Sequence, residues 1–235
     1  MLTRRLFCGC VPLAVAAISA TAARAEAPEC AVYTPEKQAG VTPDDAIELL
    51  KAGNQRFLSG QTINCDLLAQ VKATAGGQAP FAAIVGCMDS RVPPELVFDQ
   101  RIGDIFSVRI AGNFVNMDMI GSLEFAARAA GVRAIVVLGH SACGAIRGTI
   151  DNVELGNLTA TLANIRPAVD ATTGGGDRTV ANPDFVQAVA DTNARMAAEM
   201  IAERSQLIKD MVDAGELRIA WAMHDISTGQ VTFHG

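Results

Sequence analysis

Two short motifs carry side chains that could bind a transition-metal ion. Cys87 opens the first motif, and His140 and Cys143 form a His-x-x-Cys pattern much further along the chain. Thiolate and imidazole groups are ligands that zinc prefers, and catalytic zinc sites hold three protein ligands and keep a fourth position open. We therefore predict a zinc site whose ligands are Cys87, His140 and Cys143.

Two charged residues of the first motif would control the fourth position on this ion. Asp89 could fill that position itself, giving a closed site, or it could hydrogen-bond a water bound there. Arg91 is suited to bind the Asp89 carboxylate in bidentate fashion and hold it off the metal. In an open site zinc lowers the pKa of its bound water to about 7, so the expected nucleophile is zinc-bound hydroxide.

Each half of this set also has a simpler interpretation. A cysteine after a buried strand is often only a small apolar residue, and His-x-x-Cys spacing arises by chance. A structural zinc with Asp89 as its permanent fourth ligand, or a disulfide between Cys87 and Cys143, would use some of the same residues. The disulfide would leave His140, Asp89 and Arg91 without a role. From the residues alone these alternatives stay open.

Buried strands must bring the two motifs together. Apolar runs alternate with helical patterns and predict an α/β fold, with a mostly parallel β-sheet flanked by helices. The predicted strands are 81–85, 105–110, 134–138, 217–223 and 231–233. Cys87 follows the first strand and His140 the third. Because ligands bind at the carboxyl ends of strands in an open sheet, we expect both motifs to meet in one crevice.

Helices are predicted before, between and after these strands. Thr42 and Pro43 offer an N-cap and a first-turn proline for an amphipathic helix that continues to Phe57. Helical spacing also covers 122–130, and 185–212 is typical of one or two long helices. The fold is thus expected to have an N-terminal helical arm and a helical C-terminal region, all within a single catalytic domain over 26–235.

Residues 1–25 have the features of a cleavable export signal. Arg4 and Arg5 precede an apolar run, which ends in the A-x-A cleavage pattern of Ala23 and Ala25. The run is too short to span a bilayer comfortably, so no membrane attachment is expected after cleavage. The arginine pair resembles a twin-arginine signal, although an ordinary Sec signal also begins with basic residues. We predict a periplasmic or otherwise exported protein.

Charge and cysteine content exclude several classes of protein. The 235-residue chain has a net charge of −6, and removing residues 1–25 leaves 16 basic and 25 acidic residues, a charge of −9. This balance argues against nucleic-acid binding, which depends on clustered Lys and Arg. The 6 cysteines are too few for a disulfide-stapled mini-domain. In an oxidising compartment Cys30 and Cys65 could form a disulfide, or they are two unrelated thiols.

The two motifs closely resemble those of the β-class carbonic anhydrases. That family's Cys-x-Asp-x-Arg and His-x-x-Cys motifs stand here at 87–91 and 140–143. Similar segments extend over nearly the whole mature chain, at 53–57, 92–95, 99–104, 109–113, 121–124 and 228–229. The resemblance implies reversible hydration of carbon dioxide to bicarbonate and a proton. It also implies one Zn²⁺ per chain on Cys87, His140 and Cys143, with Asp89 and Arg91 as the catalytic dyad.

The resemblance further implies a homodimer or homotetramer, with active sites in clefts near the dimer interface. Two other functions stay open. One is hydrolysis of carbonyl sulfide or carbon disulfide on the same fold, and the other is non-catalytic binding of zinc or bicarbonate. The Asp89–Arg91 pair argues against the second, because a structural zinc needs no group that orients water.

Some positions differ from the usual sequence of the family. Arg101 stands where Gly is commoner and His224 where Tyr is frequent, and we expect neither to touch the proposed ligands. Some relatives carry a Trp before the first zinc cysteine, in a bicarbonate site that favours the closed state. Residues 81–86 contain none, which favours the open form. His224 and His234 are expected to be ordinary residues, although either could relay protons.

Overall fold

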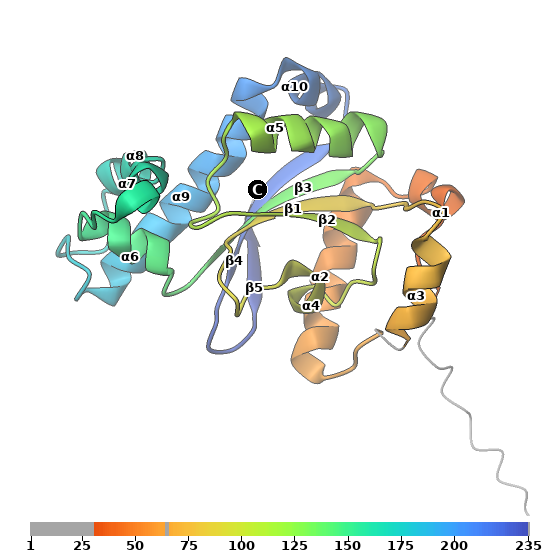
Figure 1. Cartoon of the computed structure of the whole chain (residues 1–235), viewed down its shortest axis with the longest axis horizontal. Coiled ribbons are helices and arrows are strands. Elements are labelled where there is room, and N and C mark those ends of the chain that lie inside the picture. The colour runs from red at the N-terminus through yellow and green to blue at the C-terminus, as the bar shows by residue number, and fades with distance from the viewer. Residues whose placement is uncertain (1–30, 64–65, 235) are drawn as a thin grey trace, which may run out of the picture.

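A five-stranded sheet lies between two layers of helices (Figure 1). The computed structural model describes residues 31–63 and 66–234. The strand order is β2-β1-β3-β4-β5, in which neighbouring strands are parallel except that β5 is antiparallel to β4. The strands are β1 (Ala82–Gly86), β2 (Ile105–Arg109), β3 (Ala134–His140), β4 (Arg218–His224) and β5 (Val231–His234). The predicted α/β fold with a mostly parallel sheet is confirmed.

The central strands are apolar throughout because both of their faces are covered. Every residue of β1 and β3 is buried. Alternate side chains of β1 enter different cores: Ala83 and Val85 pack with one helical layer, and Ala82 and Ile84 with the other. This is the pattern expected of parallel strands with helices on both faces.

One helical layer comes mainly from the N-terminal part of the chain. Its helices are α1 (Pro35–Ala39), α2 (Pro43–Ser59), α3 (Leu67–Thr74) and α4 (Pro94–Val97). The predicted cap of α2 is confirmed, because the Thr42 hydroxyl accepts from the Asp45 N–H and the Asp45 carboxylate accepts from the Thr42 N–H. Ala46, Ile47 and Leu50 of α2 then pack beneath the sheet.

The other layer and the far end of the sheet carry the remaining helices. α5 (Met117–Glu124) continues into a π-helical turn, η1 (Phe125–Ala129). α6 (Gly144–Ile150), α7 (Gly156–Ala163) and α8 (Arg166–Ala171) cluster beyond the carboxyl ends of the strands (Figure 1). α9 (Pro183–Arg204) and α10 (Gln206–Asp213) complete the layer. Ser205 separates α9 from α10, and its hydroxyl caps α10 by accepting from the Ile208 N–H.

Several predicted boundaries of helices and strands need correction. The helix predicted over 122–130 begins five residues earlier, at Met117. The third strand does not end at 138 but continues through His140.

The predicted export signal at 1–25 lies outside the described residues, and so do Cys30 and Cys65. Across the ranges that the structure describes, no helix combines the length and apolarity needed to cross a membrane.

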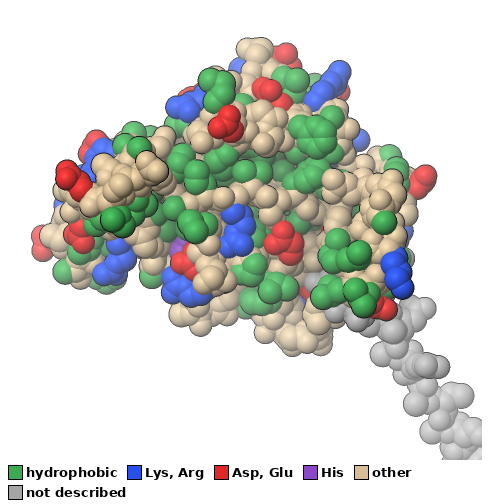
Figure 2. All heavy atoms as spheres, viewed as in Figure 1, with side chains coloured by type: hydrophobic (Ala, Val, Ile, Leu, Met, Phe, Trp, Pro, Cys, Tyr) green, Lys and Arg blue, Asp and Glu red, His purple; other side chains and the backbone are tan. Residues whose placement is uncertain are grey.

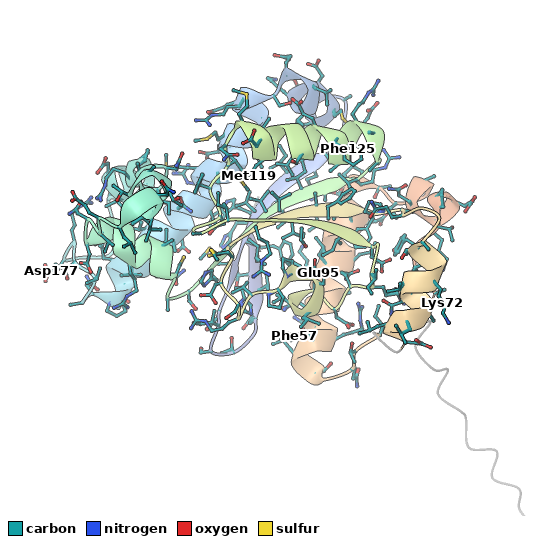
Figure 3. All side chains as sticks on the ribbon, in the orientation of Figure 1. Phe57, Lys72, Glu95, Met119, Phe125 and Asp177 are labelled. Carbon is teal, nitrogen blue, oxygen red and sulfur yellow. The ribbon has the colours of Figure 1, made fainter. Side chains whose placement is uncertain are left out.

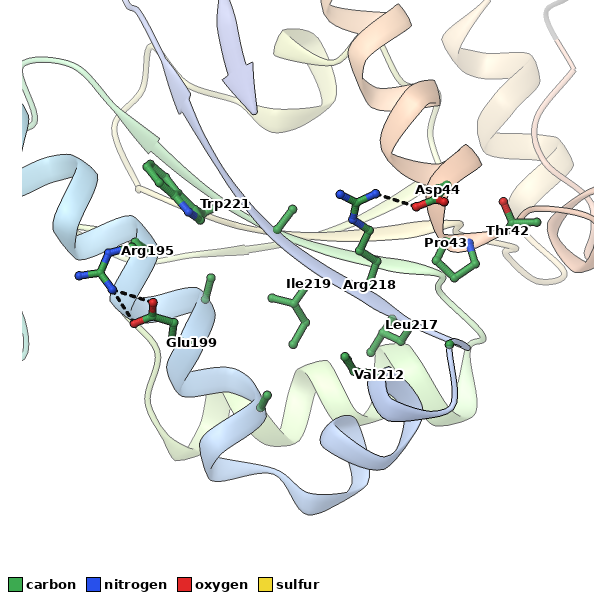
Figure 4. A pocket seen from close by; sticks show the side chains of 14 residues that line it. Thr42, Pro43, Asp44, Arg195, Glu199, Val212, Leu217, Arg218, Ile219 and Trp221 are labelled. Carbon is green, nitrogen blue, oxygen red and sulfur yellow. Dashed lines mark hydrogen bonds and ion pairs between the residues drawn. The ribbon is translucent and has the colours of Figure 1, made fainter. Parts of the chain in front are cut away.

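A groove borders the uncovered half of β4. β5 pairs only with residues 221–224, so Arg218, Ile219 and Ala220 lie beside a cavity of about 710 Å³. Figure 4 shows it between β4, the Arg195–Glu199 ion pair of α9 and the Arg218–Asp44 ion pair. None of the predicted zinc ligands lines this groove.

Candidate metal centre

The ends of β1 and β3 bring the three predicted ligands together. Cys87 directly follows β1, His140 is the last residue of β3, and Cys143 is the N-cap of α6. Their ligand atoms all lie within 4.8 Å of one another, and all three residues are buried. The turn that joins His140 to Cys143 has Ala142 in the left-handed region, with φ of +53°. The predicted meeting of the two motifs is confirmed.

The spacing and hydrogen bonding of these atoms fit a zinc ion. The sulfur atoms of Cys87 and Cys143 are 4.0 Å apart. Two thiolates at about 2.3 Å from a tetrahedral ion would be separated by about 3.8 Å. His140 Nδ1 lies 3.0 Å from the Ser141 carbonyl oxygen, which can only accept, so this nitrogen donates. His140 Nε2 is buried without a hydrogen-bond partner in the described chain, and so is free to bind a metal.

The protonation of the two thiols also favours a cation between them. A hydrogen bond from Cys143 is the largest cause that lowers the pKa of Cys87, to about 4, and the hydrogen bond from the Gly112 N–H acts in the same direction. The same pairing with Cys87, together with burial, raises the pKa of Cys143. One proton is thus shared between two sulfurs, and a metal ion could replace it. Both cysteines are free thiols, so the alternative Cys87–Cys143 disulfide is not formed.

Asp89 and Arg91 form a bidentate pair beside the cluster. Arg91 Nε donates to Asp89 Oδ1 at 2.9 Å and Nη2 donates to Oδ2 at 2.7 Å. The Arg91 N–H adds a third bond to Oδ1 at 3.0 Å. These hydrogen bonds hold the pKa of the Asp89 carboxyl well below its usual range. Asp89 Oδ2 lies 4.0 Å from His140 Nε2, which places the ionised carboxylate next to the candidate metal position.

Two further groups, neither of them among the predicted site residues, hold the Cys87 loop. Arg109, at the end of β2, donates from Nε to the Cys87 carbonyl at 2.9 Å and from Nη2 to the Asp89 carbonyl at 2.6 Å. The Gly112 N–H donates to Cys87 Sγ at 3.3 Å. Segment 109–113 stood out only by its resemblance to the family. The signal that could have found both groups is that β2 is parallel to β1, so its carboxyl end must lie beside Cys87.

Arg101 and His224, the two residues that differ from those usual in the family, have different surroundings. Arg101 is buried and binds Asp104 Oδ2 at 3.4 Å. His224 is the register partner of His140 across β3 and β4, so it lies next to a ligand residue in the sheet, but its ring nitrogens make no hydrogen bond to any described residue. Burial is the main cause that lowers the pKa of His224. His234 stacks on Trp221 with ring centroids 4.0 Å apart, which gives it a packing role.

Comparison with known proteins identifies the family. Residues 82–231 match the family model described as carbonic anhydrase. The chain is 33% identical to carbonic anhydrase 2 of Mycobacterium tuberculosis over 197 residues, which cover 80% of this chain and 91% of that protein. Among solved structures, a tetrameric β-carbonic anhydrase of Sordaria macrospora matches with a TM-score of 0.60 and 26% identity, covering 68% of this chain and 83% of that one.

A second structure supports the fold alone. The β-carbonic anhydrase CafA of Aspergillus fumigatus matches with a TM-score of 0.63 and 24% identity, over 70% of this chain and 79% of that chain. The family match takes in both motifs, from the end of β1 to the turn before α6. On these grounds the chain belongs to the carbonic anhydrase family, and to its β class.

Proposed function

We propose that the chain hydrates carbon dioxide reversibly at a zinc ion held by Cys87, His140 and Cys143, with one ion per chain. The observation that carries this proposal is the buried cluster of two sulfurs and an unpartnered imidazole nitrogen, all within 4.8 Å. When bound, zinc supplies a Lewis acid that lowers the pKa of a coordinated water to about 7. Tetrahedral coordination by three protein ligands would leave the fourth position for water or substrate.

Asp89 and Arg91 act as the residues that orient the attacking water. An ionised carboxylate only accepts hydrogen bonds, and its two oxygens offer about four lone-pair sites. The Arg91 guanidinium occupies two of these lone-pair sites and the Arg91 backbone N–H a third. Asp89 can therefore accept one more hydrogen bond, from a water O–H. Accepting that bond turns a lone pair of the water oxygen toward the substrate carbon. Asp89 therefore positions the nucleophile rather than removing its proton, because its pKa is too low for a base at neutral pH.

The same pair supports the open form of the site. Both Asp89 oxygens are engaged by Arg91, and turning the carboxylate onto the metal would break this bidentate charge-assisted pair. Arg109 holds the loop carbonyls on either side of Met88, which restrains Asp89 from turning toward the metal. We propose that the fourth position is free for water at neutral pH.

We further propose that two copies associate through the outer edge of β2. Within the described residues β2 pairs only with β1, so its other edge has no strand partner. A surface hollow of about 560 Å³ lies between β2 and α5. Figure 2 shows apolar side chains gathered over this region. Met117 is 84% exposed and Phe125 58% exposed, and Figure 3 shows Phe125 at the end of α5. Exposed apolar patches beside an open strand edge are typical of subunit interfaces.

This association would place the metal centre near the interface. Arg109 ends β2 and contacts the Cys87 loop, while Met88 in that loop is 65% exposed. Light scattering from the protein in solution should give the mass of a dimer or a tetramer. Phe125→Glu should shift it toward monomer, whereas Leu68→Glu, at an exposed leucine of α3, should not. A monomeric parent protein would overturn the proposal.

We propose that residues 1–25 direct export through the twin-arginine route and that 26–235 form the mature domain. The support is the Arg4–Arg5 pair, the apolar run and the A-x-A pattern. Replacing both arginines with lysine should leave precursor in the cytoplasm of a Tat-competent bacterium. Unchanged export of that variant would favour the Sec route.

The choice of substrate is tested by comparing the rates of three reactions. Zinc-loaded protein starting at Glu26 is assayed for hydration of carbon dioxide and for hydrolysis of carbonyl sulfide and carbon disulfide. We expect carbon dioxide to be turned over much faster than either sulfur compound. Faster hydrolysis of a sulfur compound would reassign the substrate, and no turnover of any of them would indicate a binding role.

A further inference from the structure

A buried amide on α9 contacts the loop that supports Cys87. Asn193 is 4% exposed, and its Nδ2 donates to the Gly112 carbonyl at 2.8 Å, across 81 positions of the chain. The Asn193 side chain lies among apolar residues of the core, including Val189 and Ala197 of the same helix. A polar group in such a place costs stability unless its hydrogen bonds are made, so this contact is specific.

Gly112 is held in a conformation that other residues do not readily adopt. Its φ is +82°, and a Cβ atom there would lie 2.3 Å from Ile165 Cδ1. In this conformation the Gly112 N–H donates to Cys87 Sγ at 3.3 Å. Ile165 therefore restricts Gly112 on one side and Asn193 anchors its carbonyl on the other. Both contacts restrict the backbone of Gly112, the residue whose N–H points to the sulfur.

We propose that Asn193 is a positioning residue for the metal centre, which fixes the Gly112 N–H on Cys87 Sγ and thereby sets how strongly that sulfur donates to zinc. The inference rests on the proposed zinc site. A hydrogen bond donated to a thiolate withdraws electron density from sulfur and orients it. Groups that hold metal ligands in this way alter both metal affinity and the electronic state of the ion.

The proposal makes a distinction that a purely structural role would not. If Asn193 only anchors α9, its loss should lower the stability of the fold and leave the sulfur–metal bond unchanged. If it sets the Gly112 N–H, its loss should change the sulfur–metal bond even in molecules that remain folded. A spectroscopic reading of that bond therefore separates the two roles.

The test uses an isosteric pair of substitutions. Asn193→Leu keeps the shape of the side chain and removes its donor. Asn54→Leu is the control, because Asn54 is another buried amide and its bonds do not reach the metal loop. Its Nδ2 donates to the backbone carbonyls of Val97 and Gly229, and its Oδ1 accepts from the Val231 N–H. Asn193→Ala repeats the measurement should the leucine variant not fold. Each protein is substituted with cobalt and its thiolate-to-cobalt absorption band recorded, and zinc release to a chelator is timed on the folded protein.

We expect Asn193→Leu to shift the cobalt band and to release zinc about 10- to 100-fold faster than the parent. Asn54→Leu should change neither reading, whatever its effect on unfolding. A parent-like band and release rate in both Asn193 variants would overturn the proposal. Failure of the zinc site itself is distinguishable, because the parent protein would then take up neither zinc nor cobalt.

Discussion

Arg91 binds both carboxylate oxygens of Asp89, and the nearer of these to the metal ligands, Oδ2, lies 4.0 Å from His140 Nε2. The carboxylate is therefore close enough to the candidate metal position to orient a water there. Its hydrogen bonds to Arg91 restrain it from becoming a ligand. The balance between these two roles depends on one guanidinium group.

Arg91→Ala should abolish most activity without loss of metal. Without the bidentate pair Asp89 is free to turn onto the metal and displace the water, so we expect hydration of carbon dioxide to fall at least about 100-fold. Zinc content by mass spectrometry should stay at one ion per chain. Arg195→Ala is the control, because Arg195 also forms an ion pair, with Glu199, but on the distant groove. Loss of zinc from Arg91→Ala would contradict this account of the pair.

Cys143→Ala and Asp89→Ala should separate ligand from dyad. Removing a thiolate ligand should reduce zinc content to a small fraction of the parent value, together with activity. Removing Asp89 should abolish most activity and spare zinc, because the three ligand atoms of the cluster remain. Zinc content and hydration rate are measured on the same preparations. Equal metal loss in the two variants would show that Asp89 is itself a ligand.

The zinc-free protein should show unequal reactivity of its two buried thiols. The pKa of Cys87 is lowered to about 4, chiefly by the hydrogen bond from Cys143, while the pKa of Cys143 is raised. Because its pKa is lowered, Cys87 stays a thiolate to lower pH than an ordinary cysteine, so its alkylation by iodoacetamide should fall less between pH 8 and 5.5 than that of a free thiol. Cys143 should react more slowly over that range.

Peptide mass spectrometry distinguishes these two cysteines from the others in the chain. Bound zinc should protect both, and Cys143→Ala should slow alkylation of Cys87 at pH 5.5 by removing the main cause of its low pKa. Preferential labelling of Cys143 would contradict the assignment of the shared proton to the Cys143 sulfur.

Gly112→Ala should destabilise the fold more than alanine at an unobstructed glycine. Both Gly112 and Gly60 have positive φ, but nothing lies within 4 Å of a Cβ at Gly60. Left-handed strain alone costs about 1–2 kcal/mol at Gly60. At Gly112 the clash with Ile165 should add about 1–3 kcal/mol. Urea unfolding of the zinc-free proteins measures the difference, and equal destabilisation would show that Ile165 can move aside.

The sequence was sufficient to predict most of the sheet. Continuous apolar runs mark β1 and β3 because both faces of these strands are buried, and a polar turn marks the entry to β5. The end of β3 was predicted too early because Gly139 and His140 interrupt the apolar run. Short helices such as α6, α7 and α8 were missed because each buries few residues and has little periodicity of its own.

The site was predictable as a set of residues but not as a network. Cys87, His140 and Cys143 were identified because their side-chain chemistry and their places after strands agree. The contacts from Arg109 and Asn193 use backbone carbonyls as acceptors, and such contacts leave no pattern in the sequence. The position of His224 depends on the register of β4 against β3, which apolar spacing does not determine.

The most direct test of the account is stopped-flow hydration of carbon dioxide by the protein starting at Glu26, measured with one zinc per chain and again after the metal is removed. We predict rapid turnover that rises with pH through about 7, is lost with the metal and returns when zinc is restored. Activity that appears only above about pH 8 would contradict the open form. Absence of turnover at every pH in the zinc-loaded protein would contradict the proposed function.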